Sequence, residues 1–188
     1  MDTSAIREFQ IDEDIRLRLV AEDDVAQVMH LVQENYSHLR TFMEWAKPEY
    51  DEPDARDWIE RAVKAADDLS TLNYLILRGT KMIGTIGFAS FDHDAKVTEI
   101  GYWIDRDEQG KGIMGRACRK LVEAAFETLG MNRIQIRCAS ANVRSGAIPK
   151  RLGFKLEGTQ RRHVMRDGVI YDFLIYGLLR DEWEPEHK

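Results

Sequence analysis

A glycine-rich turn between two ordered segments is the part of this sequence best suited to chemistry. The turn runs from Gln109 to Gly115, has glycines at 110, 112 and 115, and leads into an apolar stripe at helical spacing. Glycines permit positive φ angles and let the backbone approach a ligand closely. The first N–H groups of a helix lack partners within the helix, and the helix dipole adds partial positive charge there. The turn therefore predicts an anion site that suits a pyrophosphate.

Side chains near the turn support this interpretation, and the spacing argues against two common phosphate-binding classes. Lys111 and Arg116 would place mobile cations beside the anion. A Walker loop needs Ser or Thr after its lysine, whereas Gly112 follows Lys111, so an ATPase or GTPase is not expected. A dinucleotide fold carries its glycine turn in the first strand–helix unit, whereas this turn lies past residue 100. A tight strand-to-helix turn without a ligand is the alternative.

The elements that precede the turn alternate between strand and helix patterns. Ile15–Leu19 alternates apolar and charged residues, as a half-buried strand does. Helical spacing follows from Val25 and again from Pro53, and the region from Leu39 to Trp58 reads as helical. Three strands are then expected to pair in antiparallel fashion: 72–78, 81–90 and 97–104, the first two joined by a hairpin turn.

The elements after the turn complete a layered domain. The helical stripe ends near Gly130, a suitable left-handed cap residue. Arg133 to Ala139 reads as a strand that can run parallel to the previous one, because a helix connects them. A short helix around Ser145 to Leu152 and two strands flanking the Asp167-Gly168 turn follow. The order predicts the α/β (α+β) class, with a mixed, mostly antiparallel sheet and helices on both faces.

Composition bounds the class of protein. The chain has 188 residues, a formal net charge of −6, 44% apolar and 32% charged residues, as in an ordinary globular protein. This suits a single domain, 1–188, with a core from about Ile15 to Trp183 and short polar ends. No apolar run approaches the ~20 residues that span a bilayer, and the polar N-terminus differs from a signal peptide, so a cytoplasmic location is expected. The cysteines and histidines lack metal-ligand spacing, and the acidic balance argues against nucleic-acid binding.

Two blocks of the sequence resemble the GNAT superfamily of N-acetyltransferases. Gln-x-x-Gly-x-x-Gly at 109–115, after an extended strand, resembles the superfamily's acetyl-CoA pyrophosphate loop. Asn-Val-Arg-Ser at 142–145, followed by Pro-Lys-Arg-Leu-Gly-Phe at 149–154, resembles the segment in which an Asn begins a helix and Gly-Phe begins a strand. Ile-Gly-Tyr-Trp before the loop and residues 172–179 are similar to RimJ/RimL-type ribosomal-protein N-terminal acetyltransferases. The resemblance covers about 15–183.

The sequence departs from the superfamily pattern at two positions. Met114 stands where many members have Gly or Ala, and Pro149 stands where many have a tyrosine that acts as general acid. A mechanism that relies on this tyrosine is therefore not expected here.

The resemblance implies where the cofactor would bind. The pantetheine arm would lie along residues 100–104 and pair with the backbone, as an added strand does. Asn142 is a candidate to hold a pantetheine carbonyl, and Ser145 also belongs to the expected binding set. The other expected contacts are Tyr102, Trp103, Ile104, Gln109, Gly110, Lys111, Gly112, Ile113, Met114, Gly115 and Arg116.

The resemblance also supplies candidates for the catalytic groups. RimL-type enzymes place a serine at the position of Ser145, which makes it the candidate donor to the departing thiolate. Glu99 stands where relatives often keep a catalytic glutamate and is the first candidate base, with Asp172, His163 and a water chain as rivals. Helix capping is the alternative role for Ser145 and Asn142.

Aromatic and acidic side chains between Leu39 and Trp58 could line a cleft for the acceptor. Such a cleft would suit the basic N-terminus of a ribosomal protein, a polyamine or an aminoglycoside, and the resemblance favours a protein N-terminus. A helix pair with a solvated acidic face is the alternative. The residues are Phe42, Glu44, Trp45, Glu49, Tyr50, Asp51 and Glu52.

The sequence therefore predicts an acetyl-CoA-dependent N-acetyltransferase that moves an acetyl group to a primary amine by direct attack in a ternary complex. A non-catalytic acyl-CoA-binding sensor is the alternative from another class, because Pro149 replaces the usual tyrosine. The expected partners are acetyl-CoA and a basic amine acceptor, without metal, nucleic acid or membrane. Whether the chain forms a homodimer is left open.

Overall fold

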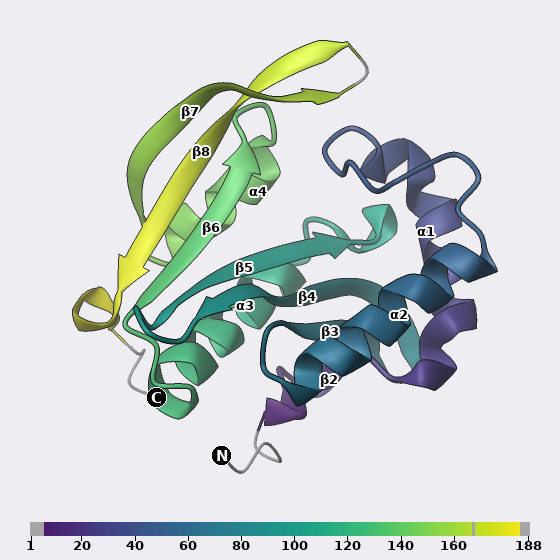
Figure 1. The fold of residues 1–188 in the computed structure, drawn as a ribbon, viewed down its shortest axis with the longest axis horizontal. Helices are drawn as coiled ribbons and strands as arrows, with labels where there is room; N and C mark the ends of the chain where they lie inside the picture. The colour runs from purple at the N-terminus through teal and green to yellow at the C-terminus, as the bar shows by residue number, and fades with distance from the viewer. Residues whose placement is uncertain (1–5, 167, 185–188) are drawn as a thin grey trace.

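An eight-stranded sheet forms the centre of the molecule in a computed structural model that describes residues 6–166 and 168–184 (Figure 1). The strand order is β1-β2-β3-β4-β5-β6-β8-β7, and every neighbouring pair is antiparallel except β5 and β6. This confirms the mixed, mostly antiparallel sheet. The strands are β1 (Glu8–Gln10), β2 (Ile15–Leu19), β3 (Leu72–Arg78), β4 (Lys81–Asp92), β5 (Val97–Ile104), β6 (Arg133–Ala139), β7 (Lys155–Arg166) and β8 (Val169–Leu179).

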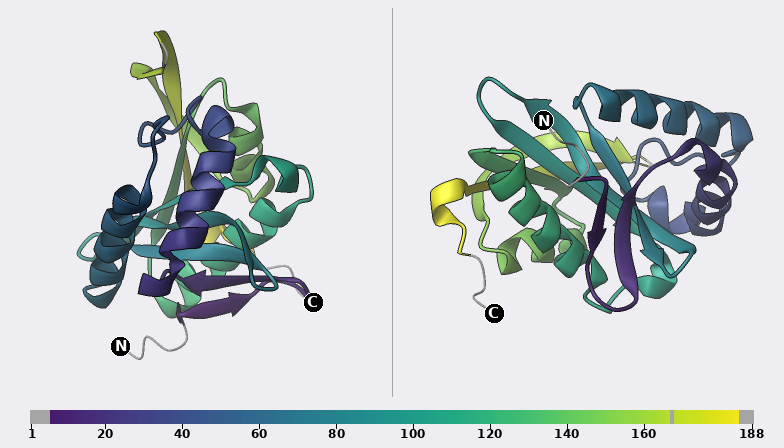
Figure 2. Two further views of the ribbon diagram at one scale, coloured as in Figure 1. Left: turned by 90° about the vertical axis from the view of Figure 1, so that its right-hand side faces the viewer. Right: turned by 90° about the horizontal axis from the view of Figure 1, so that it is seen from below.

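Helices cover both faces of this sheet, as Figure 2 shows from two further sides. Because alternate residues of a strand point to opposite faces, Tyr74 and Ile76 of β3 enter the core under α3, whereas Leu75 and Leu77 enter the core under α1 and α2. Among the described residues, no helix has the length and apolar content that a membrane crossing needs. The helices are α1 (Val25–Leu39), α2 (Glu52–Asp67), α3 (Ile113–Glu123, continued by a π turn at Ala124–Thr128) and α4 (Val143–Arg151).

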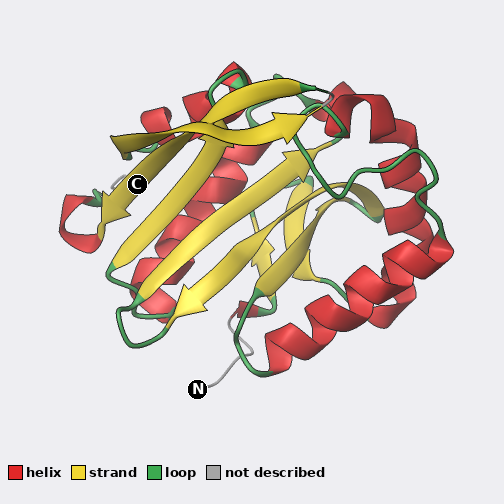
Figure 3. Ribbon diagram, turned by 45° about the horizontal axis from the view of Figure 1, so that its top comes forward, coloured by secondary structure: helices red, strands yellow, loops and turns green. Residues whose placement is uncertain are grey.

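The sheet opens between β5 and β6. Their parallel pairing covers only three residue pairs in the described structure, from Val97 with Arg133 to Glu99 with Gln135. On its other edge, β5 stays paired with β4 as far as Ile104. Figure 3 shows β5 and β6 diverging after their short paired stretch. In the described part of the chain, no strand pairs with this edge of residues 100–104, where the pantetheine arm is expected.

Two segments differ from the expectations drawn from sequence. Residues 40–51 form turns, so the helical reading of Leu39 to Trp58 is wrong over that stretch. Pro48 would interrupt a helix through this stretch, because proline lacks a backbone donor and disfavours helix at the residue before it. Strand β1 was not predicted, and its Phe9 is buried in the core together with Ile6. The predicted Asp167-Gly168 turn falls partly outside the described residues, since Asp167 is not among them.

Candidate active site

The glycine turn at the start of α3 has the backbone geometry that its sequence predicts. Gly110 and Gly112 have φ angles of 78° and 72°, and Gly112 is the N-cap residue of α3. Buried Asn35 on α1 holds the loop in place, because its side-chain oxygen accepts the backbone N–H of Arg106 at 2.9 Å. Glu108, in the same loop, forms an ion pair at 2.8 Å with Arg78 of β3, which ties the loop to the sheet.

A cleft of 1610 Å³ lies between this turn, β5, α4 and the end of α1. All residues expected to bind the cofactor line the cleft except Lys111, whose ammonium pairs with Glu108 at 3.0 Å. The first N–H groups of α3 follow the left-handed turn and have no partner within the helix. The glycines at 110, 112 and 115 keep the space beside these groups free of side chains. The cleft therefore fits an elongated cofactor that carries a pyrophosphate.

Arginines dominate the charge of this cleft. Arg116 pairs with Asp12 at 2.8 Å, so it is less mobile than the sequence suggested. Burial opposes charge on Asp12, but hydrogen bonds from the backbone and from Arg116 outweigh it and lower the pKa of this carboxyl. Glu108 is the single acidic residue in the described lining. The lining arginines are Arg106, Arg116, Arg119, Arg144 and Arg151, and this excess of cations suits a ligand with several phosphates.

Gln109 links two elements across the cleft. Its side-chain nitrogen lies 2.6 Å from Nε2 of His38 at the end of α1, and its oxygen accepts a hydrogen bond from Arg144 on α4. Burial, with the charges of Arg144 and Arg106 as further causes, lowers the pKa of His38. This imidazole is therefore neutral at pH 7.

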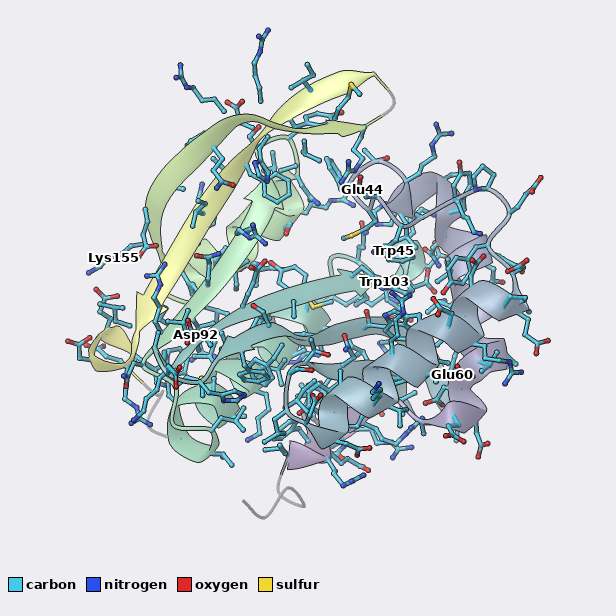
Figure 4. The ribbon with its side chains drawn as sticks, viewed as in Figure 1. Glu44, Trp45, Glu60, Asp92, Trp103 and Lys155 are labelled. Carbon is cyan, nitrogen blue, oxygen red and sulfur yellow. The ribbon has the colours of Figure 1, made fainter. Side chains whose placement is uncertain are left out.

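A second cavity of 580 Å³ is walled by the 40–51 segment, α2, β4, β5 and the ends of β6 and β8. The predicted aromatic residues Phe42, Trp45 and Tyr50 line it, and the rings of Trp45 and Trp103 lie 6.1 Å apart (Figure 4). The acids expected there do not line it. Asp54 and Asp57 of α2 do, and they pair with Lys47 and Arg61.

The hairpin of β7 and β8 reaches over to the 40–51 segment, and the described residues of the two elements form a ring contact and an ion pair. The rings of Phe42 and Tyr171 lie 6.1 Å apart, and Nη2 of Arg166 lies 3.3 Å from a carboxylate oxygen of Glu44. We call these two contacts the bridge. Phe42 also lines the second cavity, so the bridge lies directly beside it.

Ser145 and Tyr102 line both cavities, as do Phe42, Met43, Trp103 and Asn142, so the two cavities share a wall. The Tyr102 hydroxyl donates to the backbone carbonyl of Ser145 at 3.1 Å, and Oγ of Ser145 donates to the Tyr102 hydroxyl at 3.3 Å. Burial raises the pKa of Tyr102 well above its usual value, so the phenol keeps its proton. Asn142 caps α4 by accepting the N–H of Ser145 at 3.1 Å, which leaves the Ser145 hydroxyl free of the capping role.

The candidate bases lie outside both cavities. Glu99 is held by Arg137, whose Nε lies 3.0 Å from both carboxylate oxygens. Asp172 accepts the backbone N–H of Arg162 at 2.8 Å, and exposed His163 packs against Phe173. The structure thus brings Ser145 together with the residues expected to bind the cofactor and leaves the three candidate bases outside both cavities.

Tyr102→Phe is expected to lower kcat about 3- to 10-fold, the usual effect of one lost hydrogen bond, because the hydroxyl orients Ser145. The dissociation constant for the expected cofactor should hardly change. Steady-state kinetics and calorimetry would measure both quantities. In a Ser145→Ala background the same change should have no further effect, and full additivity of the two substitutions would contradict this positioning role.

The glycine turn, the opened sheet and the arginine-lined cleft together fit an acyl-CoA-dependent transferase. Residues 14–155 match the acetyltransferase (GNAT) domain, and the chain belongs to this family. It is an N-acetyltransferase, and its cosubstrate is acetyl-CoA.

Particular relatives extend over nearly the whole chain. It is 34% identical over 182 residues to the putative ribosomal N-acetyltransferase YdaF of Bacillus subtilis (strain 168), covering 94% of this chain and 97% of the relative. It is 27% identical over 172 residues to the ribosomal-protein-serine acetyltransferase of Escherichia coli (strain K12), covering 92% and 96%.

Solved structures agree in fold. The microcin C7 self immunity acetyltransferase MccE, in complex with acetyl-CoA and AMP, is 29% identical, with a TM-score of 0.85 and coverage of 90% of this chain and 94% of that one. RimL, the ribosomal L7/L12 alpha-N-protein acetyltransferase in complex with coenzyme A, has a TM-score of 0.88 at 24% identity and covers 92% and 97%. The comparisons confirm the predicted family, fold class and cosubstrate.

Proposed function

We propose that this enzyme acetylates the N-terminal α-amino group of a protein, with a ribosomal protein in the cytoplasm as the acceptor. The observation that carries the proposal is the wall that the two cavities share, which includes Ser145 and Tyr102. An arginine-lined cleft on one side suits the cofactor, and an aromatic cavity on the other suits the end of a polypeptide. The relatives named for ribosomal-protein acetylation support the same acceptor.

The chemistry of an α-amine fits a site whose candidate bases are not in contact with the cavities. The attacking amine must be neutral, and an α-amino group has a reference pKa of ~7.7–8.0, compared with ~10.4 for lysine. A water chain to Glu99, Asp172 or His163 would then be enough to remove the proton. Backbone N–H groups on the open edge of β5 near Trp103 would stabilise the developing oxyanion. Ser145 would give its proton to the departing thiolate and take one back from the water chain that receives the proton of the amine, so that its hydroxyl is restored.

The two cysteines support direct attack by the amine over an acetyl-cysteine route. Cys138 lines the second cavity, and burial raises the pKa of its thiol, as it does for fully buried Cys118. A cysteine nucleophile requires a lowered pKa so that the thiolate is present. We therefore assign no covalent role to Cys138.

The acceptor is tested by measuring thiol release from acetyl-CoA with peptides that begin with a free α-amine. We expect turnover with basic peptides taken from ribosomal-protein N-termini. The matched control is the same peptide with a blocked N-terminus and an internal lysine, which should give none, because the lysine amine is protonated at neutral pH. Turnover with polyamines or aminoglycosides alone would contradict a peptide acceptor. Tight acetyl-CoA binding without turnover on any amine would support the sensor alternative.

A further inference from the structure

Gly101 is a strand glycine that the fold itself does not require. Its φ is not positive, and a Cβ built there would meet nothing closer than Cβ of Ala89 at 3.9 Å. Its cross-strand partner Gly87 is different, because a Cβ there would lie 2.3 Å from the backbone oxygen of Leu72. Glycine in the middle of a strand is destabilising relative to alanine. An alanine would therefore suit the protein at position 101 better, unless the space is used for something else.

The missing side chain of Gly101 opens space in the second cavity. Successive residues of a strand point to opposite faces, so Gly101 faces the same side as Trp103, which packs with the α1–α2 core. Gly101 and Ala89 both line the cavity, and because their side chains are absent or small, no bulky group fills this part of it, which we call the bare floor. Gly101 also directly precedes Tyr102, whose hydroxyl contacts Ser145. Gly101, Tyr102 and Ser145 all line this cavity, so the space at Gly101 belongs to the cavity that reaches the Tyr102–Ser145 contact.

We propose that Gly101 is a specificity-determining residue, because the bare floor admits the substituent on the carbon that carries the acceptor amine. For a peptide acceptor this substituent is the first side chain. This inference rests on the proposed function, because it assumes that the acceptor amine enters through the second cavity. A methyl group at position 101 would take the space of the first side chain, while the backbone groups of β5 would remain available to the cofactor.

The test measures kcat/KM of the wild type and of Gly101→Ala with peptides that differ only in their first residue: glycine, alanine, serine and valine. Relative to the wild type, the variant should lose little with glycine and progressively more with larger residues. The loss should reach on the order of 10-fold for the largest residue that the wild type accepts, the usual effect of one methylene in a tight pocket. Gly101→Ser is expected to follow the same order with larger losses.

Gly158→Ala is the matched control. Gly158 is also a strand glycine with open space around it and no positive φ, but it lines neither cavity. It should show no dependence on the first residue. In Gly101→Ala the affinity for acetyl-CoA should be unchanged and the melting temperature should not fall, which separates an effect on the acceptor from misfolding. An equal loss for every first residue, or no loss at all, would overturn the proposal.

The outcome also separates this proposal from the proposed function. If the wild type acetylates small amines but no peptide, the peptide acceptor is wrong. Gly101 is then tested with a pair of amines that are linear or branched next to the nitrogen. Selective loss of the branched amine in Gly101→Ala would still support the role of Gly101, and equal loss of both would overturn it.

Discussion

Gly112→Val is expected to abolish acetyl-CoA binding while the fold is retained. Gly112 lies in the left-handed region with φ at 72°, and it caps the helix whose N-terminus faces the cleft. A Cβ at this position would lie 3.1 Å from Nη1 of Arg116, and the rest of the valine would enter the space expected for the pyrophosphate. Calorimetry with acetyl-CoA should detect no binding, and circular dichroism should show a folded chain.

Gly130→Val provides the matched control for backbone strain. Gly130 has a similar φ of 68°, has open space around it, and lines neither cavity. Both variants carry the strain of a branched residue in the left-handed region, which costs about 1–2 kcal/mol. Only Gly112→Val should lose the cofactor. A folded Gly112→Val protein with wild-type affinity for acetyl-CoA would remove the turn from the binding site.

Ser145→Ala is expected to lower kcat on the order of 100-fold, the low end for general acids, with little change in acetyl-CoA affinity. The reason is that Ser145 lies in the wall that the two cavities share, whereas the capping of α4 is done by Asn142. The defect should shrink with thioesters whose thiols are more acidic, because a better leaving group depends less on proton donation. Single-turnover kinetics with a thioester series would measure this dependence.

Ser70→Ala is a suitable comparison, since Ser70 is exposed in the turn before β3 and lines neither cavity. It should keep wild-type kcat with every thioester. A Ser145→Ala defect that is independent of leaving-group acidity, combined with weaker acetyl-CoA binding, would instead make Ser145 a residue that anchors pantetheine.

Local patterns predicted much of the fold. The strand at Ile15–Leu19 has the same bounds in sequence and structure, and the hairpin after Arg78 pairs as expected. Pro53 lies in the first turn of α2, and Gly130 has the positive φ of a helix cap. These features depend on alternation, turn residues and caps within a few positions. β1 was missed because three residues with a single buried member carry too weak a pattern.

The candidate site was predicted in part, and the gaps have a common cause. The turn could be read because its chemistry lies in consecutive residues. The ion pair of Arg116 with Asp12 joins residues 104 positions apart, and Arg144 comes to the cleft on a different helix. The contact between Tyr102 and Ser145 spans 43 positions. Contacts of this kind arise only from the packing of distant elements, so no local pattern shows them.

The bridge between the β7–β8 hairpin and the 40–51 segment bears on whether an acceptor amine lies at the end of a chain or within a loop. Phe42 and Tyr171, with Glu44 and Arg166, join two elements that are distant in sequence beside the second cavity. A free chain end can enter the cavity while the bridge stays intact. A loop that is held at both ends by a folded domain could enter only if the bridge opened. For the proposed peptide acceptor, the enzyme would then select an amine that lies at the end of a chain over an amine on a loop. Lysines on the surface of folded proteins would be refused by shape before their protonation mattered.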